Sequence, residues 1–195
     1  MNRMSRYFMA LVFAAVLSAG VSVPSLAAVK ITKNTADWVL EAEQKRAEQE
    51  AQEEAAAAEA AAAAEEAASA EAQEEAIRAQ VVDYALSFVG GRYVYGGNDP
   101  HSGVDCSGFT RYVLGNAAGV ALGRSSRDQA AEGTTVSADQ MQPGDLLFYG
   151  RGSHVNHVAM YIGNGQIVHA STERTGIKVS NWNYRAPLRI ASFLG

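Results

Sequence analysis

The sequence contains little cysteine, proline or aromatic side chain: one cysteine, four prolines and 8% Phe, Trp and Tyr among 195 residues. A single cysteine excludes a disulfide framework within the chain, and a Cys/His metal centre needs several closely spaced ligands. The net charge is −5 and no basic cluster is present, so the composition does not indicate nucleic-acid binding. We expect no metal, no cofactor and no nucleic-acid partner.

The first residues have the pattern of a secretory signal. Two arginines precede an apolar run from Tyr7 to Ala19, and the small residues up to Ala27 suit a cleavage site. The run is shorter than the ~20 residues that a membrane-spanning helix needs, which disfavours the alternative of a short membrane anchor. We expect residues 1–27 to be a signal peptide, and the mature protein to be exported without a membrane span.

The stretch from Ala36 to Ala79 consists mostly of Ala, Glu and Gln and contains no Gly or Pro. These residues form helices readily, but with so few large apolar side chains the stretch cannot bury a core of its own. A coiled-coil seam is disfavoured because no Leu or Ile heptad is present. We expect residues 28–77 to form an Ala/Glu-rich spacer, helical or disordered, with a partner-binding helix as the alternative.

Charge and apolar content change after this spacer. Twelve glutamates lie between Glu41 and Glu75, whereas eight acidic and nine basic residues follow from Val81 onward. Residues 78–195 are long enough to build one hydrophobic core. We expect them to form a single compact domain, and we expect the protein to be a monomer.

Apolar spacing in this domain changes from helical to strand-like along the chain. Helices are expected at residues 81–89, at residues 106–114 up to Gly115, and after Ser125 or Ser126. Short apolar runs then indicate strands at residues 146–149, 155–162, 166–170, 177–180 and 188–193. Helices first and neighbouring strands second predict an α+β domain with an antiparallel sheet.

Cys106 lies in the segment Asp105-Cys106-Ser107-Gly108-Phe109, where Asp105 is suited to cap a helix that begins at the cysteine. Backbone N–H groups at a helix N-terminus favour the thiolate, which is the reactive form of the side chain. An inert, buried thiol is the alternative. If Cys106 is reactive, we expect its thiol to be unusually acidic.

A cysteine nucleophile needs an imidazole base, and the base needs a third group to orient it. His157 and His169 lie in two apolar runs joined by Gly163-Asn164-Gly165, a strong hairpin signal. A hairpin centred on Gly163 sets the two histidines directly opposite each other on one face. A two-residue turn at Asn164-Gly165 instead puts them on opposite faces. We favour the shared face, because the chemistry requires it.

Five ordered segments of the domain resemble the NlpC/P60 family of cell-wall peptidases, and the resemblance covers about residues 81–193. They are Arg92-Tyr93-Val94-Tyr95-Gly96-Gly97, Asp105-Cys106-Ser107-Gly108-Phe109, Pro143-Gly144-Asp145-Leu146-Leu147-Phe148, His157-Val158-Ala159-Met160-Tyr161-Ile162-Gly163 and Ile167-Val168-His169-Ala170-Ser171. The resemblance implies a papain-like fold, in which a cysteine-bearing helix packs on an antiparallel sheet that carries both histidines.

The resemblance also implies roles for four residues. Cys106 is the implied nucleophile, His157 the base, and His169 the residue that orients His157. Tyr93 is implied to lie beside the nucleophile, where its hydroxyl and the Cys106 backbone N–H stabilise the oxyanion.

Contacts with the peptide substrate are implied for Asp105, Ser107 and Ser126. His101 and His154 fall outside the family motifs, so we expect both to be solvated loop residues; a contact of His101 with substrate is the alternative.

The function implied by the resemblance is that of a secreted, cell-wall-associated bacterial thiol protease. It would hydrolyse the stem peptides of peptidoglycan, between γ-D-glutamate and a diamino acid. A thiol amidase or acyl-transferase acting on another cell-wall or lipid substrate would use the same side chains and is the alternative. A wall-binding protein without catalysis does not require Cys106, His157 and His169 together, so this set argues against that class.

Overall fold

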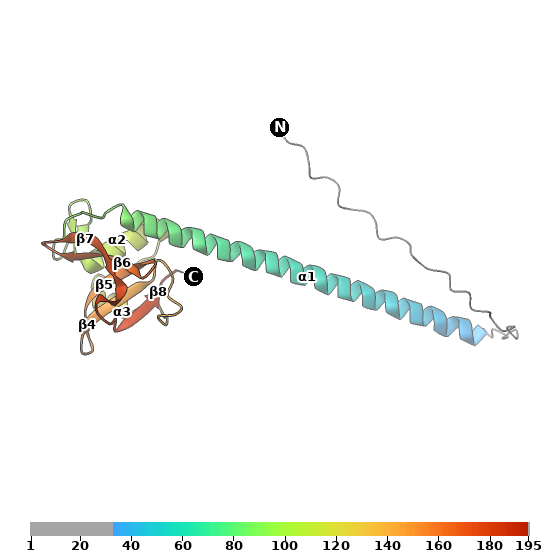
Figure 1. The fold of residues 1–195 in the computed structure, drawn as a ribbon. Helices are drawn as coiled ribbons and strands as arrows, with labels where there is room; N and C mark the ends of the chain where they lie inside the picture. The colour runs from blue at the N-terminus through green and yellow to red at the C-terminus, as the bar shows by residue number, and fades with distance from the viewer. Residues whose placement is uncertain (1–32, 195) are drawn as a thin grey trace, which may run out of the picture. The chain divides into compact units, whose positions relative to one another are not determined.

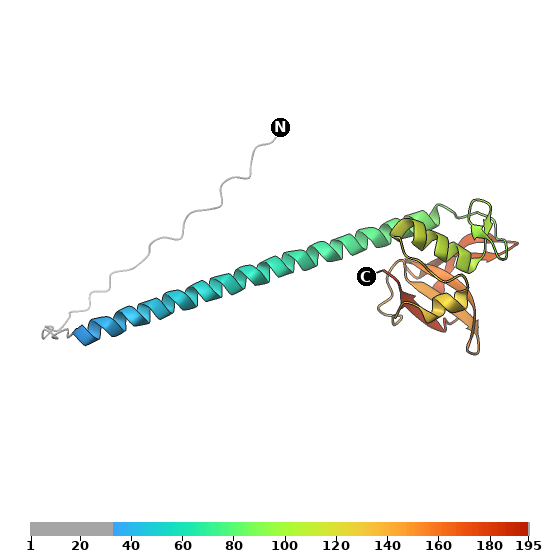
Figure 2. The same cartoon turned by 180° about the vertical axis from the view of Figure 1, so that it is seen from behind.

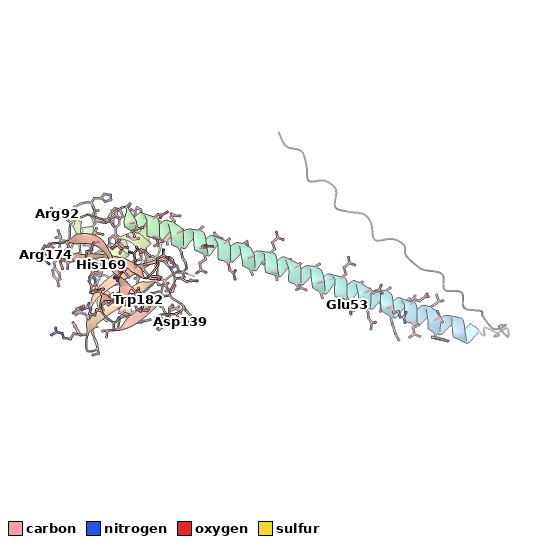
Figure 3. The ribbon with its side chains drawn as sticks, in the orientation of Figure 1. Glu53, Arg92, Asp139, His169, Arg174 and Trp182 are labelled. Carbon is pink, nitrogen blue, oxygen red and sulfur yellow. The ribbon has the colours of Figure 1, made fainter. Side chains whose placement is uncertain are left out.

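A computed structural model describes residues 33–194 of the chain (Figure 1). The chain divides into two units, residues up to Ala57 and residues from Ala58 onward, and the boundary falls within helix α1 (Lys33–Leu86). In the first unit every residue from Asp37 to Ala57 is exposed, and Glu53 points away from the helix (Figure 3). The expected signal peptide, residues 1–27, lies outside the described residues.

Helix α1 is continuous because the Ala, Glu and Gln residues that dominate it have high helix propensity, and no Gly or Pro interrupts them. The helix ends a few residues before Gly90, whose φ of +92° is not helical. Between residues 33 and 194, no helix combines the length and the apolar character needed to cross a membrane.

The second unit pairs helices with a sheet, and the predicted α+β class with an antiparallel sheet is confirmed. Helices α2 (Cys106–Ala118) and α3 (Ser126–Ala131) lie on one side of the sheet, as the reverse view shows (Figure 2). Six antiparallel strands make up the sheet, in the spatial order β3-β8-β4-β5-β6-β7. They are β3 (Thr134–Thr135), β4 (Leu146–Arg151), β5 (His154–Gly163), β6 (Gln166–Thr172), β7 (Gly176–Asn181) and β8 (Arg189–Ser192).

Three small elements complete this unit. Strands β1 (Asn98–Asp99) and β2 (Gly103–Val104) form a separate two-stranded ladder just before α2. A 3-10 turn, η1 (Trp182–Tyr184), follows β7. The sequence pattern predicted none of the three, because each element is too short to show a hydrophobic period.

Both faces of the central strands are buried, because neighbouring side chains of a strand point to opposite sides of the sheet. Leu146 and Phe148 belong to the main core, together with residues of α1 and α2. Leu147 and Tyr149 belong to a second cluster, which Trp182 partly covers. The main core therefore fixes α2, and Cys106 with it, against the sheet.

Helix α1 joins this core near its C-terminal end. Ile77 is half-buried and packs on the core, and Arg78 is only 7% exposed. Arg78 donates hydrogen bonds to the backbone carbonyl oxygens of Pro143 and Leu194 and to the carboxylate of Asp145. The end of the Ala/Glu-rich stretch therefore packs on the core of the second unit, which its composition did not predict.

The second helix is longer than predicted. It continues through Gly115 and ends at Gly119, whose φ of +68° is left-handed and whose N–H donates to the Leu114 carbonyl oxygen. A glycine inside a helix costs only about 1 kcal/mol. The buried side chains of Val113 and Leu114 and the half-buried Ala117 and Ala118 pack on the core and offset that cost.

Candidate active site

Cys106 is the first residue of α2, and Asp105 caps the helix as predicted. One carboxylate oxygen of Asp105 accepts a hydrogen bond from the Gly108 N–H at 2.8 Å, and the other accepts one from the Gly96 N–H at 2.9 Å. These bonds hold the preceding loop and the first turn of the helix together. The cap thereby fixes the position of the cysteine at the helix N-terminus.

Asp105 also forms an ion pair with Arg124. The guanidinium donates to both carboxylate oxygens, at 3.0 and 2.8 Å, and to Ser107 Oγ at 3.1 Å. Burial alone would raise the pKa of Asp105, but the hydrogen bonds from Arg124, Gly108 and Gly96 outweigh it and hold the pKa below its usual value. Since both oxygens are bonded and the residue is 6% exposed, Asp105 is better placed to hold Arg124 and Ser107 than to grip a substrate ammonium group.

The pKa of the Cys106 thiol is raised, whereas a helix N-terminus alone would lower it. Burial is the largest cause, and the negative charge of Asp105 adds to it. The backbone N–H groups of Val158 and Ser107 oppose the shift by donating to the sulfur. The direction of this shift is opposite to that of the acidic thiol expected from the sequence, because burial favours the protonated form of Cys106. The hydrogen bond from the Val158 N–H places the sulfur against β5, the strand that carries His157.

The hairpin that carries the two histidines combines a tight turn with a β-bulge. Gly163 pairs with Gln166 across the two-residue turn Asn164-Gly165, both of whose residues have positive φ. Tyr161 pairs with Ile167, so Ile162 is an extra residue in β5 that shifts the register by one. The tight turn alone would place His157 and His169 on opposite faces of the sheet. The extra residue of the bulge returns them to the same face. Continuing this register sets His169 opposite Ala159, so the prediction that it lies directly opposite His157 is wrong.

The two histidines nevertheless share one face and contact each other diagonally. His157 Nε2 lies 2.7 Å from His169 Nδ1, and His169 Nε2 lies 3.1 Å from Ser180 Oγ. Burial, and then His169 and Arg185, lower the pKa of His157 to about 3. Burial, and then Lys178, lower the pKa of His169 to about 4. Both imidazoles are therefore neutral at pH 7. Figure 3 labels His169 within the sheet.

Cysteine and histidines belong to one neighbourhood. Burial raises the pKa of Tyr184, the charge and hydrogen bond of Arg185 oppose the shift, and negative charge on the Cys106 sulfur adds to it, which puts the sulfur within electrostatic range of this tyrosine. The Tyr184 ring centroid is 6.0 Å from that of His169. The structure thus gathers around Tyr184 the nucleophile and the imidazoles that the sequence singled out.

A cavity of about 540 Å3 opens beside the thiol. Its lining includes all the site residues predicted on the cysteine side: Tyr93, Asp105, Cys106, Ser107 and Ser126. Burial raises the pKa of Tyr93, and negative charge on Cys106 adds to the shift, which fits a phenol close to the sulfur. A larger cavity, of about 720 Å3, has neither Cys nor His in its lining, so the Cys106 cavity is the candidate active site.

The two remaining histidines lie at the surface. His101 Nδ1 contacts the Asp99 carboxylate at 2.9 Å, and His154 Nε2 contacts Arg127 at 3.2 Å. Both residues are exposed; His101 lies in a turn as expected, whereas His154, expected in a loop, is the first residue of β5. Between residues 33 and 194, no group of three His, Cys, Asp or Glu side chains is placed to hold a metal ion.

Sequence reasoning missed three residues that position the site: Ser180 and Tyr149 beside the histidines, and Gln129 beside Ser107. Ser180 reaches His169 only because β7 pairs with β6, and Tyr149 pairs with His157 across β4 and β5. Gln129 is fully buried, accepts a hydrogen bond from Thr110 and donates to the Ser107 carbonyl oxygen, which locks α3 onto the first turn of α2. A single polar residue in a strand or short helix carries no local signal of such a contact.

Several proteins match the same part of the chain. The "Probable endopeptidase p60" of Listeria monocytogenes is 42% identical over 101 residues, which are 52% of this chain and 20% of that protein. The "Gamma-DL-glutamyl hydrolase" of Bacillus subtilis is 39% identical over 115 residues, 57% of this chain and 27% of that protein. The "Murein DD-endopeptidase MepS/Murein LD-carboxypeptidase" of Escherichia coli is 37% identical over 107 residues, 55% of this chain and 56% of that protein. The chain thus spans from a fifth to somewhat over half of the length of these relatives.

A solved structure matches the compact unit as well. The crystal structure of the NlpC/p60 domain of peptidoglycan hydrolase SagA superposes with a TM-score of 0.55 at 40% sequence identity, and covers 60% of this chain and 98% of that chain. The model of the NlpC/P60 family matches residues 90–188, just over half of the 195 residues. Since the matched segment runs from the loop before Cys106 to the strands that carry the histidines, the chain belongs to the NlpC/P60 family.

Proposed function

We propose that the protein is a secreted cysteine peptidase that hydrolyses the stem peptides of bacterial peptidoglycan. The observation that carries the proposal is the 2.7 Å contact between His157 Nε2 and His169 Nδ1, together with a cysteine at a helix start whose sulfur accepts a hydrogen bond from the residue after His157. The names of the relatives support it, since they describe an endopeptidase, a γ-DL-glutamyl hydrolase and a murein endopeptidase. Within this class we propose that the enzyme cuts the bond between γ-D-glutamate and a diamino acid.

The hydrogen-bond chain through the histidines selects one tautomer for the base. If His169 Nε2–H donates to Ser180 Oγ, then His169 Nδ1 is an acceptor and His157 must carry its proton on Nε2. His157 Nδ1 then presents a lone pair. His169 therefore orients His157 and stabilises the imidazolium that forms when Nδ1 takes a proton.

Acylation starts from a neutral pair, because burial disfavours both the thiolate and the imidazolium. As the Cys106 sulfur attacks the carbonyl carbon, His157 Nδ1 takes the thiol proton. The carbonyl oxygen becomes an oxyanion, to which the Cys106 backbone N–H and the Tyr93 hydroxyl donate. His157 then gives its proton to the leaving amine as the C–N bond breaks, which leaves a thioester on Cys106.

Water completes the cycle. His157 Nδ1 removes a proton from the water that attacks the thioester, and the C–S bond breaks to release the new carboxylic acid and regenerate the thiol. We assign Ser107 and Ser126 to hydrogen bonds with the acyl part of the peptide, and Asp105 to holding Arg124 at the cavity wall. A γ-linked glutamate carries its α-carboxylate beside the main path, where the Nε–H of Arg124 can bind it, since the other donors of this guanidinium are bonded to Asp105, Ser107 and Gly97.

Digestion of purified peptidoglycan followed by mass spectrometry tests the proposal. We expect fragments with a diamino acid at their new amino end, a new γ-D-glutamate carboxyl end on the remaining stem, and intact glycan strands. The Cys106→Ala protein, folded as judged by circular dichroism, should release none of them. A freed lactyl group on muramic acid would identify an amidase, a cut between D-residues a DD-endopeptidase, and growth of cross-linked products a transferase.

A further inference from the structure

Arg185 follows the short helix η1, whose first residue, Trp182, is labelled in Figure 3. Its guanidinium carbon lies 5.4 Å from the ring centroid of Tyr149 and 5.9 Å from that of Tyr184. The side chain is half-buried, and its Nε is buried without a hydrogen-bond partner among the described residues. None of the ion pairs between residues 33 and 194 includes Arg185. The guanidinium also forms a hydrogen bond with the Tyr184 side chain. A partly desolvated cation that lies over aromatic rings and has no counter-ion is a binding group for an anion.

The two tyrosines under Arg185 are neighbours of the proposed catalytic histidines. The Tyr149 ring centroid is 6.1 Å from that of His157, and the Tyr184 ring centroid is 6.0 Å from that of His169. The positive charge of Arg185 is one of the causes that lower the pKa of His157, after burial and His169. Arg185 therefore lies on the histidine side of the site. It is absent from the lining of the Cys106 cavity, on the cysteine side.

The two sides receive different parts of a substrate. The acyl part becomes bonded to the Cys106 sulfur, and the proposed contacts for it line the cavity on the cysteine side. The leaving amine must come within reach of the His157 imidazole to receive its proton. The leaving fragment therefore extends along the histidine side, where Tyr149, Tyr184 and Arg185 lie together.

We propose that Arg185 binds a carboxylate of the leaving fragment, so that the enzyme selects stems whose diamino acid side ends in or carries a free carboxylate. This inference rests on the proposed function. The planar guanidinium presents its N–H donors as a fork that matches a carboxylate, and the two aromatic rings hold its plane in advance. An amide at the same place accepts fewer hydrogen bonds and carries no charge.

A pair of substrates tests this selection: L-alanyl-γ-D-glutamyl-L-lysine with a free C-terminal carboxylate, and the same peptide as its C-terminal carboxamide. We expect the protein to cut the acid with a kcat/KM about tenfold above that of the amide, the factor that one charge-assisted hydrogen bond supplies. In Arg185→Gln the ratio should fall close to one, through loss on the acid. Arg111→Gln removes an equal charge from the exposed face of α2 and should keep the ratio. An Arg185→Gln protein with the melting temperature and the acid preference of the parent would overturn the inference.

Binding to the Cys106→Ala protein separates this inference from the proposed function. Calorimetry with the uncleaved acid and amide peptides should give about tenfold tighter binding of the acid, and Arg185→Gln should remove that difference. If the parent cuts neither peptide while this difference is present, the proposed bond is wrong and the carboxylate site stands. If the parent cuts both peptides equally and Cys106→Ala binds them equally, the carboxylate site is wrong and the peptidase stands.

Discussion

At the scale of single residues, burial sets the resting protonation of the proposed site. It raises the pKa of the Cys106 thiol and lowers that of the His157 imidazole, so an ion pair between them is disfavoured before substrate arrives. A neutral pair requires the base to act during the attack rather than before it. Reactivity toward small electrophiles and reactivity toward substrate are therefore separate properties of this thiol.

Alkylation of Cys106 measures the first of these properties. At pH 6 we expect iodoacetamide to modify Cys106 more slowly than it modifies N-acetylcysteine, with a rate that rises with pH to beyond 9, the ordinary pKa of the thiol. The reaction can be followed by mass spectrometry, and Cys106→Ala gives the blank because the chain has no other cysteine. Faster alkylation than the free thiol at pH 6 would establish a preformed ion pair.

Substitutions of three residues separate the base from its surroundings. We expect His157→Ala to lower kcat/KM by about 10²–10⁴, because it removes the proton acceptor. Ser180→Ala removes only the partner of His169 Nε2, so a loss of about fivefold in kcat with an unchanged KM is expected. His154→Ala changes an exposed histidine three residues before His157. We expect its kcat/KM to stay within about twofold of the parent's value, as for most surface substitutions. Equal losses at His154 and His157 would contradict the assignment of the base.

His169, which is buried, and His157, which is half-buried, also make stability depend on pH. Their folded-state pKa values are about 3 and about 4, against 6.5 in an unfolded chain. Below pH 6.5 the unfolded chain therefore binds protons that the folded protein does not, and above it neither state does. Below pH 6.5, we expect each of the two histidines to lower the free energy of unfolding by about 1.4 kcal/mol for every unit by which the pH falls. Urea unfolding at pH 7 and at about pH 4.5 measures this change. Between the two pH values, the free energy of unfolding should fall less for His157→Gln than for the parent or for His154→Gln. Equal falls for the three proteins would argue against a desolvated, neutral His157.

At the scale of elements, the sequence predicted what is local and missed what depends on neighbours. Apolar periods located the five long strands, and Asp105 identified the start of α2, because a cap and a period act within a few residues. The bulge at Ile162 was not predicted, since one inserted residue leaves no trace in the apolar pattern. The end of α2 was missed because the packing of Ala117 and Ala118 decides whether Gly115 is tolerated.

Arg78 shows how one element is fixed to the rest of its unit. The Arg78→Met variant keeps an apolar stem but leaves the fully buried Asp145 carboxylate without its cation. We expect a loss of about 3–5 kcal/mol in the free energy of unfolding, and partial recovery when Asp145→Asn is added. Lys45→Met breaks an exposed Lys45–Glu41 pair on the same helix and should have little effect, as exposed pairs do. A stable Arg78→Met protein would mean that water replaces the guanidinium.

At the scale of the whole molecule, the proposed site assembles from segments far apart in the chain. Tyr93, Cys106 and Ser126 come from loops and helix starts, whereas the histidines and Ser180 come from three strands. Resemblance to a family supplied the first set and both histidines. It could not supply Arg185 or Tyr184, because their nearness to the histidines follows from how η1 folds back after β7, and no motif marks it.

All these groups lie between residues 93 and 185, and the exposed part of α1 contributes none of them. A chain that begins at Ala70 keeps Glu74, Ile77 and Arg78 and with them every α1 contact to the core. We compare it with a chain that begins at Ala28. The two melting temperatures should differ by less than about 2 °C, because residues 37–69 of the removed part are exposed. The kcat/KM on soluble stem peptides should be the same for both chains. Calorimetry and a peptide assay on both chains measure these quantities. A chain that begins at Ala79 is the control, and it should be less stable because it lacks Ile77 and Arg78. A drop of many degrees on removal of residues 28–69 would mean that the Ala/Glu-rich part of α1 packs on the second unit, and a rise in kcat/KM would mean that it covers the Cys106 cavity.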